Sequence, residues 1–286
     1  MSEEIRLGYS SMTAGIYDLD EMFRLANDLS LAFVELSYDV HHFLPQAQPA
    51  RRVAELSRAT GVAVTLHLPF IDLNVASFVN PVRCAAVEQT SQALEYAERT
   101  GALCAVMHTG TVFIYQPRPL PEAVDILLES LNALPRTTIP IALENLGLYP
   151  DGLVRGPEML RDITEHSGLS NCLDFGHAHI EAGRPWLSED APCNLLESYL
   201  EILGKNIIHF HLSNNDRCND LHAPTPDGTL SFEDFAFHFK TFQGTVCLEV
   251  AGGANGVRRS VNHIRSLVRE VVPLSNTAKL TKRLDV

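Results

Sequence analysis

The chain has 286 residues, of which 45% are hydrophobic, and its formal net charge is -13. A chain of this length can bury roughly three quarters of its unfolded surface, so its core needs no disulfide. The charge disfavours non-specific binding to nucleic acid or anionic membranes. The six cysteines are scattered without a CxxC pair, and no run approaches the ~18 apolar residues of a membrane helix. We therefore expect a cytoplasmic protein without membrane association.

Eight short segments, rich in β-branched and apolar residues, predict buried strands. Most of them break into Gly, Pro, Asn or Asp at the carboxyl end. In chain order they are IRLGYSS, AFVELSYD, VAVTLHLP, LCAVMHTG, IPIALENL, NCLDFGH, IIHFHLSN and TVCLEVAGG. Apolar runs of this kind are typical of parallel strands that are covered on both faces.

Helix-patterned stretches separate these strands, for example residues 81–101, which open on Pro81 and close on Gly101. Eight alternating units predict a (β/α)8 TIM barrel, a fold of about 250 residues. We expect one domain over residues 1–286, with a polar C-terminal tail over about 272–286. Two domains or an open doubly wound sheet are the alternatives, but no linker and no GxGxxG motif after the first strand support them.

The six later strand segments each carry a side chain suited to metal or acid/base chemistry at their carboxyl end: His67, His108, Glu144, Asp174, His211 and Glu249. One such residue alone is commonly a hydrogen-bonded structural group. Six of them meeting at a barrel mouth would be costly without a cation. The mixture of imidazole and carboxylate predicts a divalent metal site, with zinc or manganese favoured over magnesium.

Three further residues on mouth loops join this group, namely His177, Asp220 and His222. With them, the chain resembles the xylose isomerase-like TIM barrels in a series of successive motifs. These are HLPFIDLN, MHTG, ALENLG, LDFGHAHIEAG, HFHLSNN, NDLHAPTPDGTLSF and LEV. That superfamily contains sugar and sugar-phosphate isomerases and epimerases, and also endonuclease IV, an abasic-site endonuclease with three zinc ions and nine ligands.

The resemblance implies a ligand set for one to three ions. The central metal would be held by Glu144, Asp174, His211 and Glu249. A second metal would be held by His67 and His108, with Glu144 as the bridging carboxylate. The third would be held by His177, Asp220 and His222, which is the least secure of the three groups.

Four other residues are candidates for substrate binding. Glu35, near the end of the second strand, could accept hydrogen bonds from hydroxyl groups, and Phe70 offers an aromatic wall for a sugar. His209 lies two residues before His211 and so points to the same side of the strand, as a packed or substrate-facing imidazole. Arg217 is one of a few isolated arginines that could meet a single phosphate.

Two chemistries suit such a site. In an isomerase or epimerase, Glu144 and Glu249 would act as ligand and proton-transfer base at a metal-held hydroxy-carbonyl group. In an endonuclease IV-like phosphodiesterase, clustered zinc ions would promote in-line displacement at phosphorus. The ligand count favours the phosphodiesterase, but the segments after the first three strands contain no Lys or Arg with which to hold a DNA backbone. The sequence alone therefore favours isomerisation of a small sugar or sugar phosphate, within carbohydrate metabolism. DNA is a partner only under the alternative, and a homo-oligomer is possible.

Overall fold

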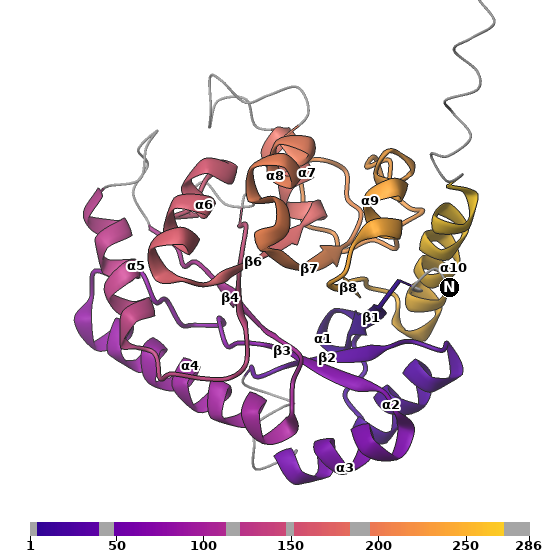
Figure 1. Cartoon of the computed structure of the whole chain (residues 1–286), viewed down its shortest axis with the longest axis horizontal. Helices are drawn as coiled ribbons and strands as arrows, with labels where there is room; N and C mark the ends of the chain where they lie inside the picture. The colour runs from indigo at the N-terminus through magenta and orange to yellow at the C-terminus, as the bar shows by residue number, and fades with distance from the viewer. Residues whose placement is uncertain (1–4, 40–48, 113–120, 147–151, 184–194, 272–286) are drawn as a thin grey trace, which may run out of the picture.

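The computed structural model describes residues 5–39, 49–112, 121–146, 152–183 and 195–271. The expected polar tail at 272–286 lies outside these residues. Eight parallel strands pair in chain order and close into a barrel (Figure 1). They are β1 (Leu7–Ser10), β2 (Phe33–Ser37), β3 (Ala63–His67), β4 (Ala105–His108), β5 (Ile141–Glu144), β6 (Ser170–Asp174), β7 (Ile207–Leu212) and β8 (Thr245–Leu248). The predicted (β/α)8 barrel fold is thus confirmed.

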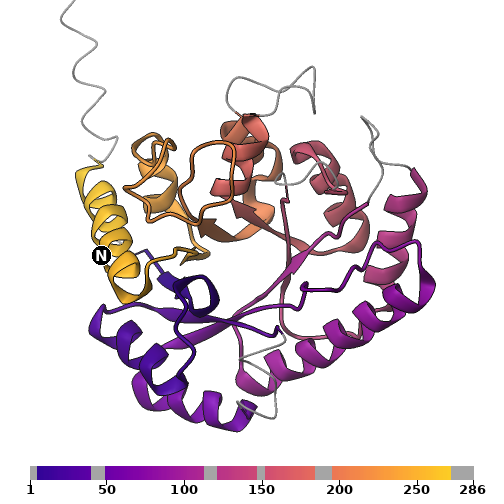
Figure 2. The same ribbon diagram turned by 180° about the vertical axis from the view of Figure 1, so that it is seen from behind.

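Helices surround the barrel in both views, and the last helix lies beside the first elements of the chain (Figures 1 and 2). The α-helices are α1 (Ser11–Ala14), α2 (Leu19–Asp28), α3 (Ala50–Thr60), α4 (Asn80–Thr100), α5 (Pro121–Ala133), α6 (Gly156–Ser167), α7 (Phe175–Ala182), α8 (Leu195–Leu203), α9 (Ala236–Thr241) and α10 (Gly253–Glu270). Two 3-10 turns, η2 (Gly204–Asn206) and η3 (Glu233–Phe235), precede β7 and α9. None of the described helices is long and apolar enough to cross a membrane.

Local sequence explains how these helices begin and end. The Asp18 carboxylate accepts a hydrogen bond of 2.8 Å from the Glu21 amide and so caps the start of α2. Helix α4 carries Pro81 in its first turn and ends at Gly101, which has a φ of 73°. Both ends of α4 match the sequence prediction, because Pro suits the first turn and only Gly adopts a left-handed end at little cost.

Strand register sets the height, along the barrel axis, of the histidines and carboxylates at the strand ends. His108 pairs with Glu144 across the β4–β5 ladder, and Asp174 pairs with His211 across β6–β7. Each of these residues lies at or near the carboxyl end of its strand, so their side chains meet at the same rim of the barrel.

The main apolar core lies between the strands and the helices. Around Phe175 at the start of α7, the rings of Phe210, Phe232, Phe235 and Phe239 pack with centroid distances of 5.2 to 6.2 Å. Inside the barrel the composition differs, because buried Glu35, Thr65, His209 and Thr245 lie below the rim residues. The site therefore rests partly on polar side chains from β2, β3, β7 and β8 and partly on the apolar cluster of Val106, Ala142 and Cys172.

Candidate metal centre

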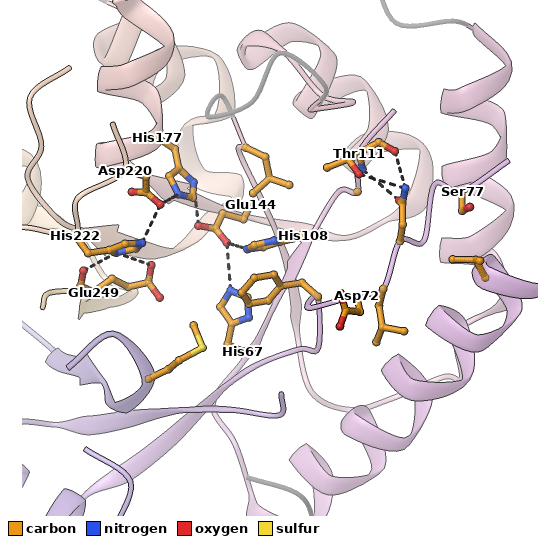
Figure 3. A pocket seen from close by; sticks show the side chains of 17 residues that line it. His67, Asp72, Ser77, His108, Thr111, Glu144, His177, Asp220, His222 and Glu249 are labelled. Atoms are coloured by element: carbon orange, nitrogen blue, oxygen red, sulfur yellow. Dashed lines mark hydrogen bonds and ion pairs between the residues drawn. The ribbon is translucent and has the colours of Figure 1, made fainter. Parts of the chain in front are cut away.

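Glu144, the last residue of β5, lies among four imidazoles. Its Oε2 atom is 3.5 Å from His67 Nε2 and 3.2 Å from His108 Nε2. Its Oε1 atom is 3.1 Å from His211 Nδ1 and 3.4 Å from His177 Nδ1. Because the two oxygens face different groups of histidines, this buried carboxylate has the geometry of a bridge between two metal positions (Figure 3).

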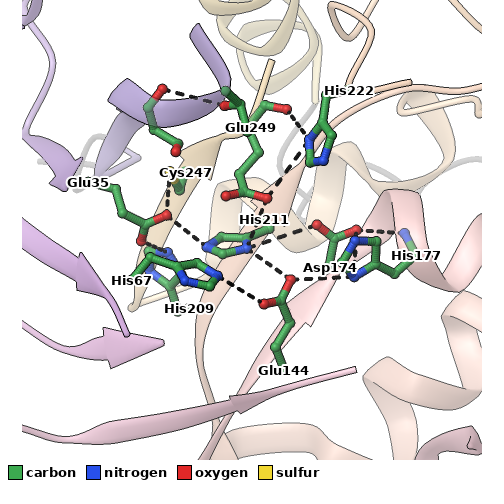
Figure 4. A network of polar contacts seen from close by, with 12 residues as sticks. Glu35, His67, Glu144, Asp174, His177, His209, His211, His222, Cys247 and Glu249 are labelled. Atoms are coloured by element: carbon green, nitrogen blue, oxygen red, sulfur yellow. Dashed lines mark hydrogen bonds and ion pairs between the residues drawn. The ribbon is translucent and has the colours of Figure 1, made fainter. Parts of the chain in front are cut away.

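The central group consists of Glu144, Asp174, His211 and Glu249, whose candidate ligand atoms all lie within 4.8 Å of one another. His211 Nδ1 faces all three carboxylates, at 3.1 Å from Glu144, 3.9 Å from Asp174 and 3.3 Å from Glu249. All four side chains are buried (Figure 4). A second group of this kind comprises His67, His108 and Glu144. The structure thus brings together the residues predicted for the first two metal positions.

Three of the histidines are oriented by backbone carbonyl groups. The Nδ1 atoms lie 2.9 Å from the Leu68 oxygen in His67, 2.9 Å from the Asn145 oxygen in His177 and 2.8 Å from the Glu249 oxygen in His222. A carbonyl can only accept, so each Nδ1 donates its proton, and in the neutral imidazole the lone pair lies on Nε2. Metal-binding histidines are typically held in this way by their second ring nitrogen.

The third predicted group meets at Asp220. One carboxylate oxygen of Asp220 is 3.0 Å from His222 Nε2 and 3.9 Å from His177 Nε2 (Figure 3). His222 also adopts a φ of 45°, a left-handed conformation that is uncommon for a residue other than glycine. Strained backbone of this kind is concentrated at functional sites, where the surroundings hold it in place.

Asn145 supports the site, although the sequence analysis did not single it out. Its side-chain oxygen accepts from the Asp174 amide at 2.7 Å, and its Nδ2 donates to the Asp174 carbonyl at 2.9 Å. Its own carbonyl orients His177. Asn145 therefore links the ends of β5 and β6 and fixes the spacing of Glu144 and Asp174. In the motif ALENLG an Asn directly follows the strand-end Glu, and this position could have pointed to a role at the site. An Asn at the end of a strand is also common simply because it ends the strand.

Asp174 uses its two oxygens differently. Oδ1 accepts a 2.6 Å hydrogen bond from the His177 amide and caps α7, whereas Oδ2 is buried without a hydrogen-bond partner among the described residues. One oxygen of Glu144 and Oδ1 of Asp220 are buried and lack a hydrogen-bond partner in the same sense. Buried carboxylate oxygens without donors are costly, so the free oxygens of Asp174 and Asp220 fit a site built for cations, while the Glu144 oxygen faces the nearby His67 and His108 imidazoles.

The pKa shifts of the site residues reflect the clustering of carboxylates around the histidines. Burial lowers the pKa of His67 and of His177, but the neighbouring carboxylates outweigh burial and raise the pKa to about 9 for His67 and about 10 for His177. For Asp174, burial together with the Glu144 and Glu249 charges outweighs the nearby histidines and raises the pKa to about 6. Burial opposes the ionisation of Glu144, yet the surrounding histidines hold its pKa well below the ordinary range. Without metal, protons on the histidines compensate the carboxylates; divalent ions would replace these protons.

A cavity of about 550 Å³ opens above these ligands. Apart from the ligands, the lining includes the apolar Met12, Phe70, Leu73, Val82 and Leu146 and the polar Asp72, Ser77 and Thr111. Asn74 also lines the cavity, but its amide is already bonded to Thr111 and to the Ala76 backbone. Among the described residues, no Lys or Arg lines this cavity.

The four residues predicted to bind substrate fall in different places. Phe70 lines the cavity and packs on His108 with a centroid distance of 4.2 Å. Glu35 and His209 are fully buried below the ligands and do not line the cavity, so the geometry gives them a supporting position instead of the expected substrate contact. Arg217 donates from Nη2 to the Ala182 carbonyl at the end of α7, at 3.1 Å, and does not line the cavity either.

The fold agrees with the sequence comparison. A family model described as xylose isomerase-like TIM barrel matches residues 23–267. The chain therefore belongs to the xylose isomerase-like TIM barrel family. It is also 28% identical over 202 residues to an uncharacterised protein of Methanocaldococcus jannaschii, a match that covers 68% of this chain and 73% of that protein.

Solved structures with the same fold include proteins of two different activities. A D-tagatose 3-epimerase-like protein superposes with a TM-score of 0.76 at 22% identity, covering 92% of this chain and 97% of the other. Endonuclease IV from Thermus thermophilus superposes with a TM-score of 0.69 at 18% identity, covering 93% of this chain and 100% of the other. At these identities the likeness establishes the shared fold, and the reaction must be argued from the site.

Proposed function

We propose that this protein is an enzyme that hydrolyses phosphoesters at a multinuclear divalent-metal centre, with zinc or manganese as the ions that suit the ligands best. One observation carries the proposal: the two oxygens of Glu144 face separate groups of histidines, at 3.2 to 3.5 Å on one side and 3.1 to 3.4 Å on the other. A carboxylate so placed is suited to bridging two ions. His177, Asp220 and His222 would hold a third.

Bound divalent ions would supply Lewis-acid stabilisation of the charge that develops on the phosphoryl oxygens. The chain itself contributes the arrangement of the ligands. His67, His177 and His222 each donate Nδ1–H to a carbonyl and so present Nε2 to the cavity. Phe70, Leu73 and Val82 supply apolar lining to the cavity beside the ligands, which reduces competing water around a bound ester.

The geometry of Glu144 also weighs against a proton-transfer role for this residue, which leaves Glu249 as the base in any isomerase. A carboxylate that moves a proton needs a free oxygen and a pKa near the working pH. Both oxygens of Glu144 lie among imidazoles, which hold its pKa well below the ordinary range. Glu144 is therefore suited to holding cations and poorly suited to taking a proton from carbon.

A metal-dependent isomerase or epimerase of a small sugar or sugar phosphate is the second candidate, and a specific observation favours it. Within the described residues, the cavity wall carries no Lys or Arg with which to grip a nucleic acid backbone. A small substrate would fit the cavity of about 550 Å³, and Glu249 at its edge would be the proton-transfer carboxylate.

Activity assays on metal-loaded protein separate these candidates. Zinc-, manganese- and cobalt-loaded samples are given bis-p-nitrophenyl phosphate, p-nitrophenyl phosphate and an abasic-site duplex, and in parallel a panel of ketoses and their phosphates. We expect hydrolysis of a phosphoester that is lost in Glu144→Gln and kept in Glu181→Gln. Glu181 is a matched control because it is a buried carboxylate that hydrogen-bonds Tyr199 and the Gly156 amide. Epimerisation of a ketose without any ester hydrolysis would overturn the proposal.

A further inference from the structure

A second buried polar layer lies directly beneath the candidate metal centre (Figure 4). Its main members are Glu35 on β2 and His209 on β7, both with no exposed surface. Neither side chain lines the cavity, and neither belongs to the nine predicted ligands. A fully buried carboxylate is expensive to maintain, so its position calls for a physical reason.

The two nitrogens of His211 face different partners. Nδ1 points to the central carboxylates, 3.1 Å from Glu144 and 3.3 Å from Glu249. Nε2 lies 3.1 Å from Oε1 of Glu35. A neutral imidazole carries one proton, so His211 can offer a lone pair from Nδ1 only if the proton is on Nε2. Glu35 is the carboxylate on that side, and its negative charge at ion-pair distance favours a proton on Nε2.

Glu35 is itself fixed by its neighbours. Thr65 Oγ1 donates to Glu35 Oε2 at 3.0 Å, and His209 Nε2 lies 3.2 Å from the same oxygen. Cys247 Sγ lies 3.6 Å from Oε1. The other ring nitrogen of His209, Nδ1, forms a hydrogen bond of 2.6 Å with Thr245 Oγ1, which fixes the orientation of the ring. The carboxylate thus has contacts from β3, β7 and β8 and little freedom to turn away from His211.

We propose that Glu35 is a positioning residue, supported by His209, that sets the tautomer and ring orientation of His211 and adds negative charge beneath the central metal position. Carboxylates behind metal-binding histidines raise the basicity of the ligand, and their removal typically weakens metal affinity by about 10- to 100-fold. This inference rests on the proposed metal centre but not on which reaction that centre performs.

A graded series of variants tests the role through metal binding. Glu35→Leu removes both the acceptor and the charge, whereas Glu35→Gln keeps an acceptor oxygen and loses only the charge. We expect zinc affinity at the tightest site to fall about 10- to 100-fold in Glu35→Leu and by a smaller factor in Glu35→Gln. Glu181→Gln, which removes a buried charge whose hydrogen bonds go to Tyr199 and the Gly156 amide, is expected to keep the wild-type affinity. If Glu35→Leu does not fold, the zinc affinity of Glu35→Gln is compared with that of Glu181→Gln.

The protonation state of His211 gives a readout that a merely structural role would not move. In the zinc-loaded wild type, imidazole nitrogen NMR should show His211 protonated at Nε2, with a hydrogen-bonded proton that shifts or disappears in Glu35→Leu. Protonation at Nδ1, or equal zinc affinity in wild type and both Glu35 variants, would overturn the inference while leaving the metal centre intact. A wild type that binds no zinc, manganese or cobalt would instead remove the metal centre, and this inference with it.

Discussion

Asn145 clamps the backbone of Asp174 from both sides, accepting from its amide at 2.7 Å and donating to its carbonyl at 2.9 Å. These two hydrogen bonds tie the end of β6 to the residue after β5, which fixes the spacing of Glu144 and Asp174. The same residue orients His177 through its own carbonyl. One asparagine therefore connects residues of the central and the third predicted metal groups.

Replacing Asn145 tests the clamp. Asn145→Ala leaves a buried amide and carbonyl without partners, at a cost of about 1 to 3 kcal/mol in the free energy of unfolding. Asn145→Asp keeps the acceptor, loses the donor and adds a like charge beside Asp174. We expect both variants to bind less metal than the wild type, as measured by elemental analysis after gel filtration. Asn171→Ala, at the opposite end of β6, is the control and should retain metal; equal metal loss in that variant would contradict the clamp.

Removing His222 separates a trinuclear hydrolase from a one-metal isomerase. The imidazole lies 3.0 Å from Asp220 and belongs only to the third predicted group. His222→Ala should lose about one metal equivalent and most of the phosphoester hydrolysis. His263→Ala is a suitable control, because His263 is a partly buried histidine whose ring contacts Thr225 and Glu233 instead of the predicted ligands. Unchanged metal content in His222→Ala would mean that the third position is not used.

Glu249 is expected to serve the site more than the fold. It follows β8 at the rim, lines the cavity and lies 3.3 Å from His211 Nδ1. Glu249→Gln should reduce kcat by at least about 100-fold, since it removes one charge from the central group, while the thermal midpoint of the metal-free protein changes little or rises. Circular dichroism melting and steady-state kinetics on the same sample check both parts. A fully active, metal-loaded variant would contradict the central ligand set.

The histidine pKa values predict how stability depends on pH. In the metal-free protein the pKa rises from 6.5 to about 9 for His67 and to about 10 for His177. Since the folded-state pKa lies above the unfolded value, this stabilisation is complete below about pH 6.5 and is lost as the pH rises towards 9 and 10. The thermal midpoint of metal-free protein should therefore fall between about pH 7 and about pH 10. A midpoint that stays constant or rises over this range would contradict the raised pKa values.

Metal binding should remove the extra protons from the same histidines. Because ligands must lose their protons, zinc binding near neutral pH should release protons, and apparent affinity should rise with pH up to about 9. Calorimetric titrations in buffers of different ionisation enthalpy measure the number of protons released. Zinc binding without proton release would show that these histidines are neutral before metal arrives.

The sequence predicted the barrel and the residues of its rim because parallel strands must deliver their carboxyl ends to one face. His67, His108 and Glu144 each end a strand, so their convergence follows from topology. The contacts of side chains deeper in the barrel were harder to predict. Alternation places His209 on the same side as His211 and one layer lower, but it does not reveal that His209 contacts Glu35 there. The role of Asn145 depends on contacts across the β5–β6 rim, which sequence periodicity does not encode.

The most direct test of a multinuclear phosphoesterase is the metal stoichiometry of purified protein, with phosphodiester cleavage measured in the same preparation. Elemental analysis after removal of loosely bound ions gives the number of zinc or manganese ions per chain. The nine converging ligands predict two to three ions per chain together with cleavage of a phosphodiester. A single ion per chain, with no cleavage and with turnover of a ketose, would contradict the proposal and leave the epimerase.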